Sequence, residues 1–431
     1  MSQPLPFLER MFREYGEVVR LRIASLRVYS IAHPDGIKHV LQENQRNYRK
    51  SFDYKILARL LGQGLVTSEG SRWLSQRRLM QPTFHRQKVA ALGTLMADCT
   101  LEMLDRWRGC AAQQQPLDVV AEMMRLTLQI VGRALLSMDL TTEAEVIGRN
   151  MTMANERFAE MGLSAFAPWL PTPVNLRFRK AAVALRRLVL DIIARRRSDD
   201  RDHGDLLSML LAVRDEDTGE AMDDEQLRDE ILTLILAGHE TTATALSWTW
   251  YLLSHNPEVE RKLHAELDQV LGGRSVSITD LPNLNYTAMV IDEAMRLYPP
   301  VWAIGRQAIR DDEVLGYYVP KGCNLVLSQW LVHRHPAFWT NPERFEPERF
   351  STERAAGRPR YAFFPFGGGP RMCIGNFFAL TEAQIVLATV AQKYRLRVLA
   401  DAPVEPHPLV TLRPRHGVKI TLERREVACA R

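Results

Sequence analysis

The sequence predicts a mainly α-helical protein with small β-sheets, an α+β fold. Apolar residues recur at helical spacing from Trp73 to about Leu140, with a Gln-rich interruption at residues 111–116. Short β-like segments punctuated by Gly, Pro and Asp follow Pro300, and others make up the C-terminal tail. The sequence contains no internal repeat or low-complexity tract, so we expect one mixed domain over residues 1–431.

The individual elements follow from local signals along the chain. Residues 18–32 predict two short strands, and His33-Pro34-Asp35-Gly36 predicts a turn that opens a helix. Residues 195–204, three arginines followed by acids and a glycine, predict a solvated loop. The longest helix should begin near Asp223 or Asp224, whose carboxylates can cap free amides, and end near Asn256-Pro257. Further strands are expected at residues 301–309, 314–319, 323–327 and 394–422, and a further helix after Gly375.

Composition excludes several classes of protein. With 431 residues, 46% of them hydrophobic and 25% charged, the chain can bury a sizeable core, which excludes a disordered or fibrous protein. The net charge of +5 is too small over this length to favour nucleic acid binding. Five cysteines without CxxC spacing indicate neither a zinc ribbon nor a disulfide framework, and they favour a reducing compartment.

No segment of the sequence is suited to crossing a membrane. The first twenty residues are rich in charge, which argues against a signal peptide or an anchor. Residues 231–253 approach membrane length, but His239 and Glu240 lie near their centre, where ionisable groups in hydrocarbon are costly. We therefore expect a buried helix there, and a cytoplasmic protein without a transmembrane anchor.

The most informative segment is a glycine-rich loop that holds a cysteine. Residues 363–375 read FFPFGGGPRMCIG and precede a predicted helix. Amides at a helix N-terminus stabilise a thiolate, and a bound metal would secure its deprotonation. A cysteine beside a Gly-rich turn is more often buried and inert. This loop, however, matches F-x-x-G-x-R-x-C-x-G in full, through Phe366, Gly369, Arg371, Cys373 and Gly375.

The complete pattern resembles the haem-binding loop of the cytochrome P450 family, and four further family elements occur in the expected order along most of the chain. The resemblance implies a P450-like fold with a long central helix over the haem. It also implies haem b (iron protoporphyrin IX) as the cofactor, the Cys373 thiolate as the iron ligand, and the other four residues of the pattern beside the haem.

Arginines are implied to neutralise the haem propionates. Trp73 and Arg77 match W-x-x-x-R, which places both side chains on one helical face. Arg306 and Arg371 are similarly placed by resemblance, since two buried carboxylates need compensating cations. Standing alone, the first pair would equally indicate a surface arginine that covers a core tryptophan.

Residues 237–242, Ala-Gly-His-Glu-Thr-Thr, match the family's oxygen-handling motif. The resemblance implies that Ala237 and Gly238 lie beside the haem, that the Thr241 hydroxyl serves oxygen activation, and that Glu240 supplies protons through water. Alternatively, Gly and Thr would merely loosen the helix and bond back to its carbonyls. His239 occupies the variable position, where it either lines the proton path or packs against a neighbouring helix.

A Glu-Arg-Arg network is implied by E-x-x-R at Glu293 and Arg296 together with Arg349 of a Pro-Glu-Arg-Phe segment. We expect a buried ion network with a structural role on the thiolate side of the fold. Arg344, in the preceding Asn-Pro-Glu-Arg-Phe, is a rival for the third position.

Several further candidates are interpreted as ordinary structural residues. His333 and His335 lack a ligand pattern of neighbouring carboxylates or cysteines, so they are expected to be loop histidines and no metal pair. The cysteines without a matched motif are expected to be structural: Cys99, Cys110, Cys323 and Cys429.

The resemblance implies a haem-thiolate monooxygenase that hydroxylates a hydrophobic substrate with O2. The sequence carries no fused flavin or nicotinamide fingerprint, so electrons are expected from a separate ferredoxin or flavodoxin with an NAD(P)H-dependent reductase. An acidic partner of this kind could dock on Arg72, Arg78, Arg86 and Lys88. The implied substrate-facing positions are mostly apolar, which favours a fatty acid, terpenoid, carotenoid or sterol: Leu234, Ala237, Val301, Trp302, Ile304 and Val410.

Two alternatives use the same cysteine loop. One is a haem-thiolate enzyme that is driven by peroxide or independent of O2, and the other is a non-enzymatic haem-thiolate sensor or carrier. Glu240 and Thr241 favour O2 activation, because enzymes that take peroxide or rearrange a substrate have no need of that pair.

Overall fold

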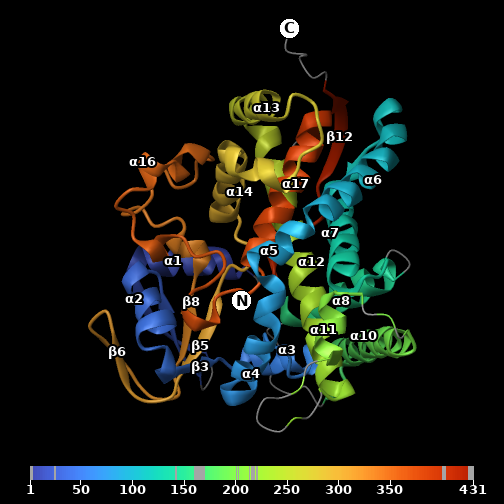
Figure 1. The fold of residues 1–431 in the computed structure, drawn as a ribbon. Coiled ribbons are helices and arrows are strands. Elements are labelled where there is room, and N and C mark those ends of the chain that lie inside the picture. The colour runs from blue at the N-terminus through green and yellow to red at the C-terminus, as the bar shows by residue number, and fades with distance from the viewer. Residues whose placement is uncertain are drawn as a thin grey trace. The chain divides into compact units, whose positions relative to one another are not determined.

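The computed structural model describes residues 3–23, 26–140, 143–159, 170–199, 201, 203–212, 214, 219, 222–399 and 404–425. It confirms the expected fold class, mainly helical with small sheets (Figure 1). The chain forms two compact units. The first comprises Met1–Ser51, Ala90–Leu126 and Thr241–Arg431, and the second Phe52–Val89 and Thr127–Glu240. Cys429 lies outside the described residues.

The first unit contains a five-stranded sheet in the order β1-β2-β8-β5-β3. Strands β2 and β8 are parallel, with Val28 opposite Asn324, and the other neighbours are antiparallel. The two strands expected at residues 18–32 thus join strands from near residue 300. The strands are β1 (Val18–Ile23), β2 (Leu26–Ile31), β3 (Tyr48–Lys50), β5 (Ile304–Ala308) and β8 (Asn324–Leu327).

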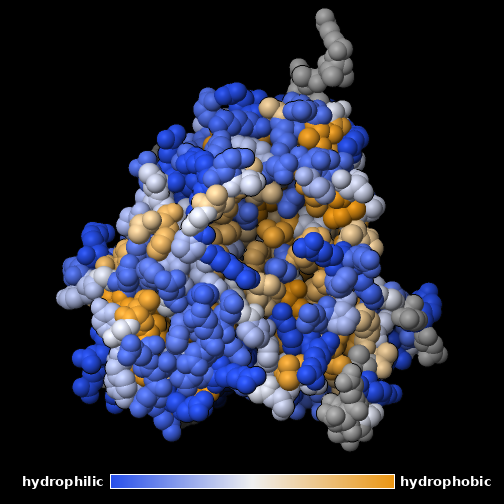
Figure 2. Space-filling view, turned by 60° about the vertical axis from the view of Figure 1, so that its left-hand side comes forward, coloured by the Kyte–Doolittle hydropathy of each residue, from blue (hydrophilic) through white to orange (hydrophobic). Residues whose placement is uncertain are grey.

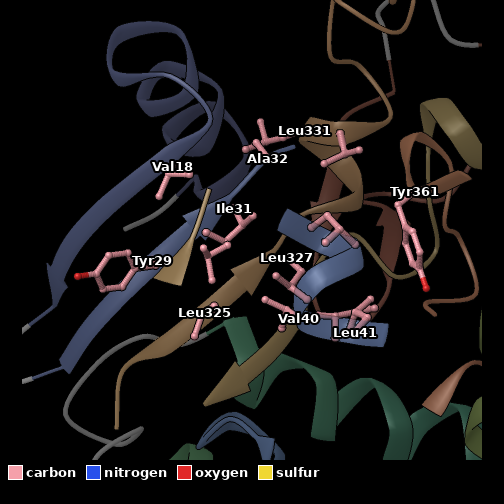
Figure 3. Close-up of a cluster of buried hydrophobic side chains, with 14 of the residues drawn as sticks. Val18, Tyr29, Ile31, Ala32, Val40, Leu41, Leu325, Leu327, Leu331 and Tyr361 are labelled. Carbon is pink, nitrogen blue, oxygen red and sulfur yellow. The ribbon is translucent and has the colours of Figure 1, made fainter. Parts of the chain in front are cut away.

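A hydrophobic core forms on this sheet. Ile31 of β2 and Leu325 and Leu327 of β8 are fully buried, and they gather with Val40 and Leu41 of the helical segment His39–Glu43 (Figure 3). Burying each such aliphatic side chain stabilises the fold by about 1.5–3 kcal/mol. The core therefore holds the sheet against segment 39–43.

Among the helices of the first unit, α13, α14 and α17 pack on one another, and α6 packs on α17. Figure 1 shows α13, α14 and α17 side by side. The helices are α1 (Pro4–Tyr15), α2 (Pro34–Lys38), α6 (Gly93–Ala112), α13 (Pro257–Leu271), α14 (Asn285–Leu297), α15 (Gln329–Val332), α16 (Thr352–Ala355) and α17 (Asn376–Lys393).

Three smaller sheets complete the first unit. One has the order β4-β12-β9, and two are hairpins, β6-β7 and β10-β11. The strand expected at residues 314–319 is part of a hairpin, because Leu315 and Gly316 turn with φ of 54° and 79°. The strands are β4 (Leu117–Asp118), β6 (Asp312–Val314), β7 (Tyr317–Val319), β9 (Tyr394–Val398), β10 (Pro406–Pro408), β11 (Leu412–Pro414) and β12 (Lys419–Arg424).

The second unit is helical. Its helices are α3 (Asp53–Leu61), α4 (Gly70–Met80), α8 (Ala144–Ala159), α10 (Pro173–Arg197) and α11 (Leu206–Ala212), while α5 (Arg86–Ala91), α7 (Val119–Leu136) and α12 (Asp224–His255) continue from one unit into the other. Among the described residues, no helix is long and apolar enough to cross a membrane. Hydrophilic residues predominate on the face shown in Figure 2, with hydrophobic residues in smaller groups between them.

Helix α12 has the bounds that its sequence signals predict. The Asp223 carboxylate accepts a hydrogen bond from the Gln226 amide at 2.7 Å and so caps the first turn. Pro257, the first residue of α13, follows directly after Asn256. With 32 residues the helix is about 48 Å long, because each residue rises about 1.5 Å.

The expectation of a solvated loop at residues 195–204 is wrong in part. Its three arginines form the last turn of α10, where Arg195 and Arg197 are exposed but Arg196 is buried. Its guanidinium pairs with Asp205 at 2.8 Å and donates to the carbonyl of Leu136. Paired with a carboxylate, a guanidinium can be buried in a segment whose composition alone indicates solvent exposure.

Candidate active site

The cysteine loop is organised by its own backbone. The Cys373 amide donates to the Phe366 carbonyl at 2.9 Å, and the Gly367 amide donates to the Phe364 carbonyl at 2.9 Å. The loop thereby closes on itself between Phe364 and Cys373. The Cys373 side chain is exposed at the end of this closed loop.

Two glycines of the loop are required by neighbouring atoms. Gly369 has φ of 63°, and a Cβ there would overlap the carbonyl oxygen of Leu41. A Cβ on Gly368 would overlap the Tyr361 ring, whose hydroxyl donates to Gln42 at 2.8 Å. The loop can therefore pack against segment 39–43 only because both residues lack a side chain.

Helix α17 begins directly after the loop. Gly375 is its N-cap residue, so Cys373 lies two residues before the cap of an 18-residue helix. The first amides of a helix have no intrahelical partners, and their positive potential favours an anion. A thiolate at Cys373 would therefore gain stabilisation from a nearby helix N-terminus.

Residues 237–242 contain the least buried positions in the middle of α12. From Asp229 to Leu253 every residue of α12 is buried except Ala237, Gly238 and Thr241. These three residues lie on one face of the helix, at spacings of one and four residues. Glu240 is fully buried. Within the motif, Ala237 is exposed and Gly238 and Thr241 are half-buried, while the acid is fully buried.

Residues around the motif pack closely against α7. His239 is buried and its Nδ1 donates to the Ile235 carbonyl at 3.0 Å, while the Thr127 hydroxyl donates to the His239 carbonyl at 3.0 Å. A Cβ on Gly238 would lie 2.9 Å from Val131 Cγ2. The close approach of α7 therefore favours glycine at this position.

The arginines expected at the propionates lie in both units. In the first unit, Arg306 is buried on β5 and Arg371 is half-buried in the cysteine loop. In the second unit, Trp73 and Arg77 are both half-buried on α4.

Two of the expected substrate segments meet within the first unit. The Trp302 indole donates to the Leu409 carbonyl at 3.0 Å, and the Leu412 amide donates to the Pro300 carbonyl at 2.9 Å. Val301, Trp302, Ile304 and Val410 are therefore carried by two joined segments. Leu234 and Ala237 belong to the second unit, where Leu234 is buried and Ala237 exposed.

Sequence reasoning missed two acids that hold the turn directly after α3, residues 62–65. The Asp229 carboxylate accepts from the Gln63 amide at 2.6 Å, and Glu230 accepts from the Leu65 amide at 3.0 Å. A Cβ on Gly62 would overlap the Asp229 carboxylate. The sequence signal that could have identified these two acids is their position as an acidic pair immediately before the apolar stretch 231–253.

Glu293, Arg296 and Arg349 form a buried ion network. Arg296 Nε donates to Glu293 at 2.6 Å and Arg349 Nε donates to Glu293 at 3.2 Å. Arg296 also donates to the carbonyls of His333, Pro342 and Arg344, so all five of its N–H groups are bonded. Arg344, the rival, contributes only its carbonyl to Arg296 and has an exposed side chain.

Within this network, burial and the neighbouring carboxylate act in opposite directions on the pKa of Arg349. Burial lowers the pKa of Arg349 below its ordinary value, while the Glu293 carboxylate acts in the opposite direction. Glu293 additionally accepts a hydrogen bond from the Glu346 amide at 2.9 Å. One carboxylate thus joins α14 to the segment around residues 340–350.

The residues present fit a haem with a thiolate ligand on two counts. Cys373 is exposed in a loop that ends at a helix N-terminus, whereas Cys99 and Cys323 are buried. Between Asp229 and Leu253, the residues of α12 that are not buried all belong to the motif that the haem is expected to contact. Neither His333 nor His335 belongs to a group of His, Cys, Asp or Glu that could hold a metal ion within the described residues.

The sequence profile of the cytochrome P450 family matches residues 2–421. The chain belongs to the cytochrome P450 family, the haem-thiolate monooxygenases.

Particular members of the family are similar over most of the chain. A cyclooctat-9-en-7-ol 5-monooxygenase of Streptomyces melanosporofaciens is 38% identical over 401 residues, which cover 92% of this chain and 85% of the relative. Pentalenene oxygenase of Streptomyces avermitilis is 37% identical over 415 residues, covering 96% of this chain and 91% of the relative. The crystal structure of the cytochrome P450DA heme domain has a TM-score of 0.89 at 25% sequence identity, covering 100% of this chain and 95% of that one.

Proposed function

We propose that this cytochrome P450 hydroxylates a hydrophobic, terpenoid-like substrate with O2, at a haem b whose iron is ligated by Cys373. The observation that carries the proposal is the exposed thiol before α17, in a loop whose packing requires glycine at two positions. Relatives named for the oxidation of pentalenene and of cyclooctat-9-en-7-ol support the substrate class.

The family's motifs assign the residues that would hold the haem. Cys373 would bind the iron, Arg306 and Arg371 would lie toward the propionates, and the loop residues Phe366, Gly369 and Gly375 would lie beside the ring. The other motifs assign Trp73, Arg77, Ala237 and Gly238 to the haem. When bound, the haem supplies O2 activation and insertion of one oxygen atom into a C–H bond, and thiolate donation favours O–O cleavage.

The protein's own contribution is proton delivery and orientation. Thr241 is half-buried on the helix face that also carries Ala237 and Gly238, and its hydroxyl would donate a proton there. Glu240 is buried in the adjacent position and would return that proton through water. Apolar side chains at Leu234, Val301, Trp302, Ile304 and Val410 would bind the hydrocarbon and exclude water from it.

Electrons would come from a separate protein with an acidic surface, a ferredoxin or flavodoxin that an NAD(P)H-dependent reductase reduces. Four basic residues of the second unit have exposed side chains, Arg72, Arg78, Arg86 and Lys88. Complementary charge accelerates association and orients the partner. We further propose that residues 1–431 act as one monooxygenase domain, without a reductase within them.

Replacing Thr241 by alanine is expected to uncouple the enzyme. Haem and substrate binding should persist, while product formed per reductant consumed falls and hydrogen peroxide rises, because the proton donor is lost. A positioned proton donor contributes about 10²-fold or more, so the rate of product formation should fall by about that factor. The matched control is Thr249→Ala, which removes a buried hydroxyl bonded to the Ala245 carbonyl in the same helix. Unchanged coupling in Thr241→Ala would contradict the assigned role.

The substrate class is tested by titrating the purified holoenzyme with a library of terpenoids, fatty acids, carotenoids and sterols. Binding beside the iron is followed by the haem spin state, and products are identified after turnover with surrogate reductases. Terpenoids should give the strongest response and oxygenated products. Spin-state changes without product under any electron supply would favour the sensor or carrier, and product formed only with peroxide would favour the peroxide-driven enzyme.

A further inference from the structure

His333 connects the ion network to the cysteine loop. It is fully buried directly after α15, and its Nε2 accepts a hydrogen bond from the Phe364 amide at 3.0 Å. Its carbonyl accepts from Arg296 Nη1 at 2.8 Å. One residue thus bonds both to the arginine of the network and to the backbone at the start of the loop.

The chemistry of this contact defines the form of the imidazole. An amide N–H can only donate, so Nε2 must present a lone pair, and a neutral ring then carries its proton on Nδ1. Burial holds the pKa of His333 well below its ordinary value, and the Arg296 and Arg334 guanidinium groups act in the same direction, against the carbonyls of Met295 and Arg296. The neutral form that Phe364 requires is therefore the form that the surroundings favour.

The contact continues through hydrogen bonds to the cysteine. Phe364 accepts from Gly367 through its carbonyl, and Phe366 accepts from the Cys373 amide, both at 2.9 Å. The His333 ring also contacts the rings of Phe363 and Phe364, with centroids 5.1 Å and 5.3 Å away. Fixing the Phe364 backbone therefore constrains the backbone that carries Cys373.

We propose that His333 is a positioning residue for Cys373: its neutral imidazole anchors the Phe364 amide and thereby sets the place of the sulfur relative to the first turn of α17. This inference rests on the proposed role of Cys373 as the iron ligand. Without the acceptor, the Phe364 amide would be buried without a partner, and the loop would relax to satisfy it.

The test compares His333→Leu, His333→Gln and His333→Asn in the purified full-length holoprotein. The Gln side chain can place an amide oxygen near the position of Nε2, whereas Asn is one methylene shorter. Two readouts are measured besides activity, the fraction of the reduced carbon monoxide complex that shows thiolate ligation, and the reduction potential of the haem iron. We expect the ratio of thiolate-ligated to thiolate-free protein to fall about tenfold in the Leu variant, the effect of leaving one buried amide unpaired. Gln should restore most of the ratio, and Asn should not.

A matched control separates positioning from general destabilisation. His335→Leu removes a second buried imidazole two residues away, whose Nδ1 accepts from the Ala337 amide at 3.1 Å and whose Nε2 pairs with Glu17. This substitution should lower thermal stability but leave the thiolate ligation and the reduction potential as in the unaltered protein.

Three outcomes would overturn the proposal. They are unchanged thiolate ligation and reduction potential in His333→Leu, equal shifts of both in His335→Leu, and the same behaviour of the Gln and Asn variants. If the Leu variant does not fold, the comparison between the Gln and Asn variants is by itself sufficient to test the proposal. Retained thiolate ligation in Cys373→Ala would overturn the ligand assignment itself, a result distinct from all of these.

Discussion

Replacing Cys373 by alanine is expected to abolish the thiolate-ligated absorption of the reduced carbon monoxide complex, together with monooxygenase activity. The iron would lose its sulfur donor, and with it the electron donation that favours O–O cleavage. The loop should keep its fold, because its closing bonds run from the backbone of Cys373 and Gly367, and its packing depends on glycines. Absorption spectra of the reduced variant with carbon monoxide, at matched haem content, measure the loss directly.

The control for this experiment is Cys323→Ala in the same unit. Cys323 is buried, and burial raises the pKa of its thiol above the ordinary value, so it is neither exposed nor inclined to form a thiolate. Its loss should leave the absorption unchanged. A thiolate signature that persists in Cys373→Ala, or that disappears in Cys323→Ala, would contradict the assignment of Cys373 as the iron ligand.

Replacing Glu293 by glutamine is expected to destabilise the first unit by about 3–5 kcal/mol, the usual cost of removing one partner from a buried ion pair. The side chain keeps its size, but Arg296 would then hold a buried positive charge without its carboxylate partner, and Arg349 would keep only its ion pair with Glu346 at 3.0 Å. Arg296 also lies over the Trp339 ring at 5.0 Å, so it cannot turn to solvent without leaving that contact. Denaturant-induced unfolding, followed by both circular dichroism and haem absorption, measures the change.

A pair with the same spacing provides the control. Glu258 and Arg261 are also three residues apart on a helix, α13, but both side chains are largely exposed. Water and salt screen such pairs, so Glu258→Gln should unfold at the same denaturant concentration as the unaltered protein. Equal effects of the two substitutions would show that burial does not give the Glu293 network its strength.

Much of the fold was predictable because its signals are local. The bounds of α12 follow from a capping carboxylate at Asp223 and from Pro257, and the first two strands follow from alternation over residues 18–32. The three arginines of α10 were assigned wrongly because charge density indicates solvent, whereas Asp205 and the Leu136 carbonyl, distant in sequence, make burial of Arg196 favourable.

The choice between Arg349 and Arg344 illustrates the same limit at the ion network. Both arginines follow Pro-Glu in short, similar segments, so the local sequence does not distinguish them. The tertiary structure brings Arg349 Nε to Glu293 and leaves the Arg344 side chain exposed. His333, interpreted from its neighbours in sequence as an ordinary loop histidine, bonds to Phe364, 31 residues later.

The sequence by itself determined the family, the cysteine loop and the oxygen-handling motif, because in each case the chemistry needs particular residues at short, invariant spacings along one loop or one helix turn. Only the tertiary structure decided what surrounds them: Val131 beside Gly238, Asp229 and Glu230 on the amides of residues 63 and 65, and His333 behind the loop. These contacts join groups far apart along the chain, and their energy depends on burial and on satisfied hydrogen bonds, which arise only when the segments pack.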